Sequence, residues 1–431
     1  MLPPRPLKFC MLTTFYPPYH FGGDAIGIQR LARGLVRRGH EVTVIHDVDA
    51  YNLLHRGPEP SAEPEPEGLT VHRLRSGWGR LSALLTQQLG RPVINGRRIR
   101  AIIEEGRFDV INFHNISLIG GPGLLAFGSG VKVYMAHEHW LVCPMHVLWR
   151  HNRELCTGRQ CMRCCLHYRR PPQYWRYTGY LKRQLRHIDT FIAMSHFSQA
   201  KHREFGLPQA MEVLPYFLPD PGGLQTPDEG TAPQERPYFL FVGRLERIKG
   251  LADVIPLFES YRDADLLIAG DGQEGENLKK LASRAPNVRF LGRLAPSELR
   301  RYYRHALALI VPSVCYETFG IILIEAFSQS VPVIARRIGP FPEIVQRARA
   351  GELFAGPEEL LAAMRRLQAD RALRTGLGRA GYEAYRRYWS ESAVIPRYLD
   401  IIARAAERHD GKKQRHVPAR AEFRDPAPTG V

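Results

Sequence analysis

Two glutamates flank a glycine in the second half of the chain. The segment that begins at residue 312 reads PSVCYETFGIILIE, which places Gly320 between Glu317 and Glu325. Gly320 stands where a helix should begin. Backbone N–H groups at a helix start form an anion site, and glycine lets a phosphate come close. A carboxylate beside a bound phosphate makes sense when it accepts hydrogen bonds from hydroxyl groups. The pattern therefore predicts a site for a phosphate that carries sugar or ribose hydroxyls.

A second motif, GRLERIKG at residues 243–250, directly follows an expected strand. Gly243 turns the chain, and Arg244 and Lys249 place two cations at the same edge of the sheet. Fixed cations stabilise the negative charge that develops on a leaving diphosphate. The alternative is an ordinary loop after a strand with two solvated bases.

Cysteines gather in a segment without a simple apolar period. Cys143, Cys156, Cys161 and Cys164 follow one another at close spacing, and Cys165 is adjacent to the last of them. Four thiolates that include a C-x-x-C pair can hold a tetrahedral zinc ion. We predict a structural zinc on the first four cysteines, with free thiols in a packed loop as the alternative.

Catalysis itself is expected to need no metal. Many enzymes that transfer sugars hold a divalent cation with Asp-x-Asp. The two such triplets here, at 47–49 and 263–265, lie outside the phosphate motifs, and we interpret both as surface turns.

Chain length, charge and hydropathy indicate the number of domains, the cellular location and the kind of partner. The chain has 431 residues, which suggests two domains, and a formal net charge of +17. No apolar run has the length of a membrane span and no secretory signal is evident, so a cytoplasmic protein is expected. The segment 150–186 combines basic and aromatic residues, which suits an anionic membrane surface or single-stranded nucleic acid; a solvated face is the plain alternative.

Strand and helix patterns alternate through both halves of the chain. Buried strands are expected at 7–12, 42–45, 71–74, 110–113, 131–135 and 190–194, and again at 238–242, 266–269, 288–291, 307–311 and 331–335. This alternation predicts an α/β fold with two Rossmann-like domains, whose parallel sheets face each other across a cleft.

The expected domain boundaries follow from this pattern. The first domain covers 1–215, with the Cys- and Arg-rich insertion at about 140–187. A linker at 216–236 leads to a second domain at 237–385. Helices at 386–407 are expected to pack back on the first domain, and 408–431 to form a basic disordered tail.

The motifs occur in an order that resembles the retaining glycosyltransferases of family 4, also called group 1, which have the GT-B fold. The resemblance covers nearly the whole chain. It rests on GGD at 22–24, RGHEVTV at 38–44, AHEHW at 136–140, GRLERIKG at 243–250, GDG at 270–272, VRFLGRL at 288–294 and the two glutamates. Ser330, where a glycine is more usual, and RRIGPF at 336–341 depart from the family pattern and bear on the donor sugar.

The resemblance implies a role for each motif. Arg244 and Lys249 would hold the diphosphate, Glu325 would bind ribose, and Glu317 would contact the transferred sugar. His137 would lie beside that sugar, and with Glu317, Arg244 and Lys249 it forms the implied catalytic set. The remaining donor-binding residues by resemblance are Gly22, Gly23, Gly243, Arg293, Leu294, Phe319, Gly320, Ile321 and Ile322.

The function that follows is transfer of a sugar, with retention, from a UDP- or GDP-linked donor to a glycolipid or polysaccharide acceptor in cell-envelope synthesis. A front-face path is expected, since no residue is placed as the nucleophile of a double displacement. Two alternatives stay open: a nucleotide-sugar epimerase or hydrolase of the same fold, and a basic nucleic-acid-binding protein, which lacks a recognised motif. His114, at the end of a strand, either faces the cleft or is structural.

Overall fold

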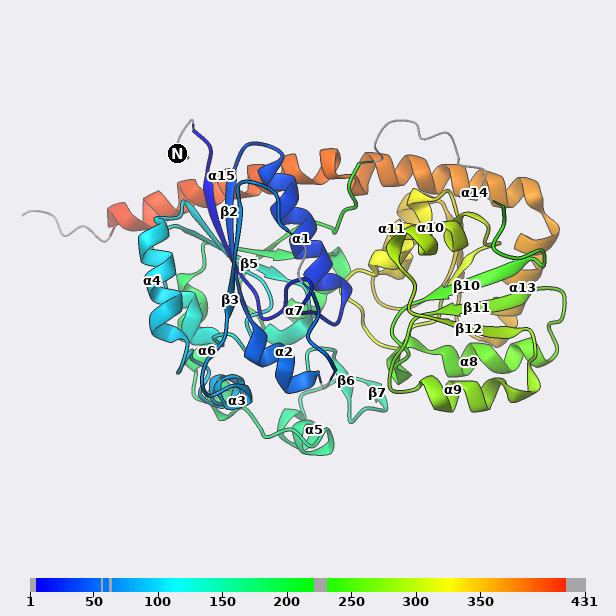
Figure 1. Ribbon diagram of the computed structural model, residues 1–431, viewed down its shortest axis with the longest axis horizontal. Coiled ribbons are helices and arrows are strands. Elements are labelled where there is room, and N and C mark those ends of the chain that lie inside the picture. Colours follow the sequence, from blue (N-terminus) through cyan, green and yellow to red (C-terminus); the bar gives the residue numbers. More distant parts are fainter. Residues whose placement is uncertain (1–4, 56, 62–63, 221–230, 416–431) are drawn as a thin grey trace, which may run out of the picture.

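The computed structural model describes residues 5–55, 57–61, 64–220 and 231–415, which form two α/β halves side by side (Figure 1). Each half is built on a parallel sheet with helices packed against it, as the alternating pattern predicts. Strands buried on both faces are continuous apolar runs, and this is why they could be located from sequence. Within the described residues, no helix is both long and apolar enough to cross a bilayer.

The first half contains a seven-stranded parallel sheet in the order β3-β2-β1-β4-β5-β8-β9. Its strands are β1 (Lys8–Leu12), β2 (Glu41–Asp47), β3 (Leu69–Leu74), β4 (Val110–Phe113), β5 (Val131–Ala136), β8 (Thr190–Ala193) and β9 (Met211–Val213). Its helices are α1 (Gly23–Val36), α2 (Val48–Leu54), α3 (Arg80–Leu89), α4 (Gly96–Gly106) and α7 (His196–Glu204). The loops after β1, β4 and β5 lead from one end of the sheet, where ligands bind in open α/β folds.

The Cys- and Arg-rich insertion leaves the sheet after β5. It holds the short antiparallel pair β6 (Trp149–Arg150) and β7 (Glu154–Leu155), followed by α5 (Cys161–His167), a 3₁₀ turn at Tyr174–Tyr177 and α6 (Tyr180–Gln184). A small apolar cluster holds this segment together; its buried members include Met145, Leu148 and Phe205.

The second half contains a six-stranded parallel sheet in the order β12-β11-β10-β13-β14-β15. Its strands are β10 (Tyr238–Val242), β11 (Asp265–Ala269), β12 (Val288–Gly292), β13 (Leu309–Val311), β14 (Val333–Arg336) and β15 (Gly351–Phe354). The helices are α8 (Leu251–Val254), α9 (Gly275–Leu281), α10 (Pro296–Arg304), α11 (Ile321–Ser328), α12 (Phe341–Ala348), α13 (Pro357–Ala369) and α14 (Arg371–Ala384).

The chain then returns to the first half. Helix α15 (Glu391–Arg415) runs from the end of α14 back along the first sheet, where it packs against β5 and α1 (Figure 1). Asn112 donates a hydrogen bond of 2.9 Å to the hydroxyl oxygen of Tyr398 on this helix. Residues 408–415, expected in a disordered tail, continue α15 instead, and 416–431 lie outside the described residues.

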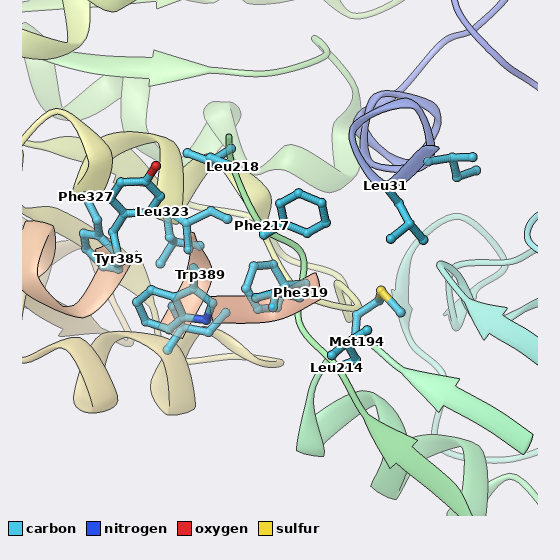
Figure 2. Packing of buried hydrophobic residues seen from close by; sticks show 14 of the residues in the cluster. Leu31, Met194, Leu214, Phe217, Leu218, Phe319, Leu323, Phe327, Tyr385 and Trp389 are labelled. Atoms are coloured by element: carbon cyan, nitrogen blue, oxygen red, sulfur yellow. The ribbon is translucent and has the colours of Figure 1, made fainter. Parts of the chain in front are cut away.

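A single apolar core connects the two halves. It contains Leu31 of α1 and Met194 after β8, together with Phe319, Leu323 and Trp389 from beyond the linker (Figure 2). The first residues of the expected linker are part of this core, since Phe217 and Leu218 are buried, whereas 221–230 lie outside the described residues. The halves therefore meet through packed side chains around the loop that carries Glu317 and the helix α11 that follows it.

Candidate active site

Helix α11 begins where the two glutamates predicted it. Gly320 precedes its first residue with φ of 95°, a left-handed conformation that favours glycine. A Cβ atom built at this position would lie 2.6 Å from Phe341 and 2.7 Å from Leu323. The helix start is thus fixed by packing, and the N–H groups of Ile321 and Ile322 lie in its first turn, where they have no partner within the helix.

Lys249 and Glu317 form a close ion pair beside this helix start. Lys249 Nζ lies 2.5 Å from Glu317 Oε1, and Ser313 Oγ donates to the same oxygen at 3.1 Å. Burial lowers the pKa of Lys249, but the neighbouring carboxylate outweighs it and the pKa is raised overall. Burial likewise raises the pKa of Glu317, and the Lys249 charge reverses this to a net lowering. Both groups are therefore charged at neutral pH.

Glu325, on the second turn of α11, is held by a residue of the other half. Arg30 of α1 approaches it at 3.5 Å, and the hydroxyl of Tyr303 donates to it at 3.3 Å. Burial raises the pKa of Glu325, and the Arg30 charge opposes this rise. The carboxylate that the resemblance assigns to ribose is thus occupied by protein groups, and a ribose would take their place or join them.

Glycines make two close approaches in this region of the chain, one between the halves and one within the second half. A Cβ atom on Gly23, the first residue of α1, would lie 3.3 Å from the side chain of Ile321. Gly22 precedes the helix in an extended conformation. Gly243 follows β10, and a Cβ on Gly270 would lie 1.9 Å from its carbonyl oxygen. Backbone therefore approaches backbone closely at the ends of β10 and β11, as a site for phosphate requires.

The other residues that the resemblance assigns to the donor differ in their exposure. Arg244 is half exposed and pairs with Glu246 at 2.6 Å, so its guanidinium lies at the rim of the site. Arg293 is exposed after β12, Leu294 beside it is half-buried, and the Arg293 charge acts on His20 and Tyr51 of the first half. Phe319 is buried against Tyr216, with ring centroids 5.8 Å apart, so only its backbone can face a ligand.

His137 lies in a buried row of polar side chains. Its Nε2 is 2.8 Å from His114 Nδ1, and its Nδ1 is 2.5 Å from the hydroxyl of Tyr216. Burial lowers the pKa of His137 to about 4, so the ring is neutral at neutral pH. Because both ring nitrogens are engaged, a contact with the donor sugar requires one of them to exchange its partner. The sequence left open whether His114 faces the cleft or is structural. Its hydrogen bond with His137 gives it a structural role, because it holds the ring of His137 in place.

Polar contacts join the loop of Glu317 to the first half. The hydroxyl of Thr318 donates to the carbonyl of His137 at 2.8 Å, and Ser195 Oγ donates to the carbonyl of Thr318 at 2.6 Å. Glu343 accepts hydrogen bonds from the N–H groups of His196 and Phe197 at the start of α7. The position of Glu317 therefore depends on contacts made with the first half.

The cysteine segment gives no support from geometry for a bound metal. Cys143, Cys164 and Cys165 are buried in one cluster, Cys156 packs against it, and all seven cysteines are free thiols. Among the described residues, no three His, Cys, Asp or Glu side chains are arranged to hold a metal ion. The zinc on Cys143, Cys156, Cys161 and Cys164 stays a prediction.

The interpretation of the Asp-x-Asp triplets as surface turns was wrong for Asp47, Asp49 and Asp265, which are buried, whereas Asp263 is exposed in the bend before β11. Asp47 is buried and accepts a hydrogen bond from the N–H of Ala50 at the start of α2. Asp49 is buried and accepts from both the N–H and the hydroxyl of Ser76. Asp265 is buried and pairs with Arg236 at 2.8 Å.

Sequence reasoning missed Arg30, Ser195, Tyr216, Tyr303 and Thr318. Each belongs to the site only through a contact with a distant part of the chain, such as the pair of Arg30 and Glu325. Of these residues, only Thr318 could have been selected from the sequence, because it directly follows Glu317 in the motif.

Two family models match this chain in succession. Glycosyltransferase Family 4 matches residues 21–218, and Glycosyl transferases group 1 matches residues 225–384. Together they cover the second sheet and all of the first sheet except β1. The chain belongs to this family of glycosyltransferases, as the order of its motifs predicted, and it is an enzyme of the GT-B fold.

Curated relatives fall within the same class. The chain is 26% identical to phosphatidyl-myo-inositol mannosyltransferase of Mycolicibacterium smegmatis over 90% of this chain and 93% of that protein. It is 33% identical to sulfoquinovosyl transferase SQD2 of Arabidopsis thaliana, over 36% of this chain and only 31% of that protein.

Solved structures share the fold at low identity. Sucrose-phosphate synthase from Thermosynechococcus elongatus superposes with a TM-score of 0.69 at 18% identity, covering 96% of this chain and all of that one (100%). Anabaena HepE in complex with UDP superposes with a TM-score of 0.62 at 15% identity, covering 92% and 100%.

Proposed function

We propose that this glycosyltransferase moves a sugar, with retention of anomeric configuration, from a nucleotide-diphosphate sugar to a lipid-linked or saccharide acceptor of the cell envelope. The observation that carries the proposal is the half-buried pair of Lys249 and Glu317 beside the start of α11. A half-buried cation, helix N–H groups without partners in the helix, and a carboxylate that can accept from hydroxyls suit a sugar diphosphate.

The ion pair gives each residue a role in this reaction. In the free enzyme Glu317 balances the charge of Lys249 and holds its ammonium in place at 2.5 Å. When the donor binds, its diphosphate provides Lys249 with a second anionic partner. Glu317 can then accept hydrogen bonds from sugar hydroxyls, while Lys249 and Arg244 stabilise the charge of the leaving diphosphate.

Retention is proposed to follow a front-face path. The carboxylate at the centre, Glu317, is paired with Lys249 and is thereby a poor nucleophile for a covalent intermediate. The acceptor hydroxyl attacks from the side of the leaving group, and its proton passes to a phosphate oxygen. We propose that the fixed cations take the place of a divalent ion.

The donor nucleotide is proposed to be UDP- or GDP-linked, and the acceptor to lie at an anionic membrane surface. The proposed nucleotide is supported by the structural relative HepE, which was solved in complex with UDP. The proposed membrane location of the acceptor is supported by the name of a curated relative, phosphatidyl-myo-inositol mannosyltransferase.

The test is a screen of nucleotide-diphosphate sugars by thermal shift, followed by transfer to a lipid-linked acceptor in the presence of EDTA. Retention is read from the anomeric proton coupling of the product by NMR. Transfer that EDTA abolishes and Mg²⁺ restores would contradict the metal-independent mechanism. Release of free sugar or an epimer, with no transfer to any acceptor, would favour the hydrolase or epimerase alternative.

A further inference from the structure

Helix α3 has its apolar and polar sides reversed. The side chains that it buries in the protein are Ser82, Ala83 and Thr86. The side chains that it leaves exposed include Leu81 at 45%, Leu84 at 38% and Leu89 at 46%. A surface helix of a water-soluble domain normally buries its apolar stripe, so this helix exposes what other helices hide.

Further exposed apolar groups adjoin the helix. Trp78, two residues before α3, is 59% exposed, and Val93 beyond its end is 41% exposed. The 3₁₀ turn at Tyr174–Tyr177 packs against α3, since the indole N–H of Trp175 donates to the carbonyl of Gln87 at 2.9 Å. Tyr174 and Tyr177, on either side of Trp175, are both exposed. We call α3, Trp78, Val93 and these two tyrosines the α3 surface.

Two stretches of the chain that form or border the α3 surface are basic. Residues 69–103 contain no Asp or Glu, and neither do residues 155–188. The exposed arginines of the first stretch are Arg80, Arg91, Arg97 and Arg98, together with Arg75 and Arg100, which lie against Glu59 and Glu104. Figure 1 draws α3 at the lower edge of the first half, away from the second half.

We propose that the α3 surface inserts into an anionic lipid bilayer, with Trp78, Leu81 and Leu84 entering the headgroup boundary. Tryptophan and tyrosine prefer the interface between lipid and water, and arginines bind anionic headgroups. A second copy of the chain would place arginines against arginines, which disfavours self-association through this surface. The proposal gives the lipid-linked acceptor of the proposed function a place of contact, and in that respect it rests on that function.

The test is sedimentation of the full chain with vesicles of phosphatidylcholine alone, or of phosphatidylcholine mixed with phosphatidylglycerol. The wild type is expected to bind the anionic vesicles and not the neutral ones. The double substitution Leu81→Ser with Leu84→Ser should lower binding by about tenfold or more, and Arg80→Gln by about fivefold. The matched control is Leu281→Ser on α9 in the second half, which is 37% exposed and should bind like the wild type.

Tryptophan emission gives an independent reading of insertion. Trp140, Trp149, Trp175 and Trp389 are buried, so Trp78 is the one tryptophan that a bilayer can newly cover. Anionic vesicles should shift the emission of the wild type to the blue, and Trp78→Phe should abolish the shift. All these side chains are exposed, so the variants should keep the wild-type melting temperature within about a degree or two.

Three results would overturn the proposal that the α3 surface inserts into the bilayer. The first is equal vesicle binding of the double variant and the Leu281→Ser control, and the second is equal binding of the wild type to neutral and anionic vesicles. The third is a wild-type dimer that forms without vesicles and that the double substitution disrupts. The last would identify a second copy as the occupant. Sugar transfer in detergent micelles is measured on the same variants. Intact transfer with lost vesicle binding supports the α3 surface, whereas intact vesicle binding without transfer to any donor and acceptor pair counts against the proposed function alone.

Discussion

The ion pair of Lys249 and Glu317 makes the sharpest prediction, tested by the substitution Glu317→Gln. The amide keeps the shape of the side chain and an oxygen that Lys249 and Ser313 can still donate to, but it removes the negative charge. Lys249 would then remain charged with only a fifth of its side chain exposed.

The expected cost in stability lies between two limits. Removing one partner of a fully buried pair costs about 3–5 kcal/mol, and an exposed pair contributes under about 1 kcal/mol. With the partial exposure of both side chains and the retained hydrogen bonds, we expect about 2 kcal/mol. For a domain of this size that corresponds to a fall of roughly 4–8 °C in melting temperature.

The loss should also depend on pH in a defined way. The folded pKa of Glu317 is lowered from 4.5, so its contribution is present above about pH 4.5 and is lost as the pH falls through the folded value. The folded pKa of Lys249 is raised from 10.5, so its contribution is present below that value and is lost as the pH rises through the folded one. The difference in stability between wild type and variant should therefore be constant around neutral pH and should shrink toward acid pH.

The assay is urea unfolding and calorimetry of the full chain, with turnover measured beside them. The matched control is Glu246→Gln, because Glu246 forms a pair of similar length with Arg244 that is half exposed. The control should cost under about 1 kcal/mol. Glu317→Gln should also lower turnover by about 10²–10³ with a smaller effect on donor KM. Equal stability of the two variants, with full turnover of Glu317→Gln, would refute both the electrostatic reasoning and the assigned role.

The other predictions concern the groups around this pair. Arg30→Met should free Glu325 for ribose and lower the donor KM by up to about fivefold, whereas a raised KM would show that Arg30 itself binds the donor. Tyr216→Phe should leave His137 Nδ1 without its partner and cost about 1–3 kcal/mol, read from urea unfolding. Gly320→Ala should cost at least about 2 kcal/mol and most of the donor binding, because the added Cβ meets Phe341; wild-type donor binding would contradict this. Elemental analysis should find about one zinc per chain, lost in Cys161→Ser, if the zinc prediction holds; an active, metal-free preparation would reject it.

Strands were the part of the fold that the sequence could place well. A parallel strand covered on both faces must be apolar throughout, so β1 and β10 appear as short apolar runs with boundaries correct to about a residue. Helix α3 could not be found in the same way. Its leucines face solvent and its buried side is Ser82, Ala83 and Thr86, so its pattern does not mark the side that packs on the protein.

The site was predictable where one motif carries it and unpredictable where contacts join distant segments. Glu317, Gly320 and Glu325 lie within nine residues of sequence around one helix start, and their spacing alone predicted that helix. The partner of Glu325 is Arg30, on the first helix of the chain. The buried aspartates show the same limit: Asp265 resembles part of a surface turn until Arg236 is brought against it.

The contacts of Thr318 suggest why the two halves and the site form together. Thr318 is bound on both sides by the first half, through the carbonyl of His137 and the hydroxyl of Ser195, and it directly follows Glu317. Any movement that separates the halves must break these hydrogen bonds and release the loop. Glu317 would keep its contacts with Lys249 and Ser313, which lie in the same half, but the backbone that follows it would lose its hold on the first half. A ligand that contacts both halves beside this loop should therefore favour the arrangement in which these hydrogen bonds are formed.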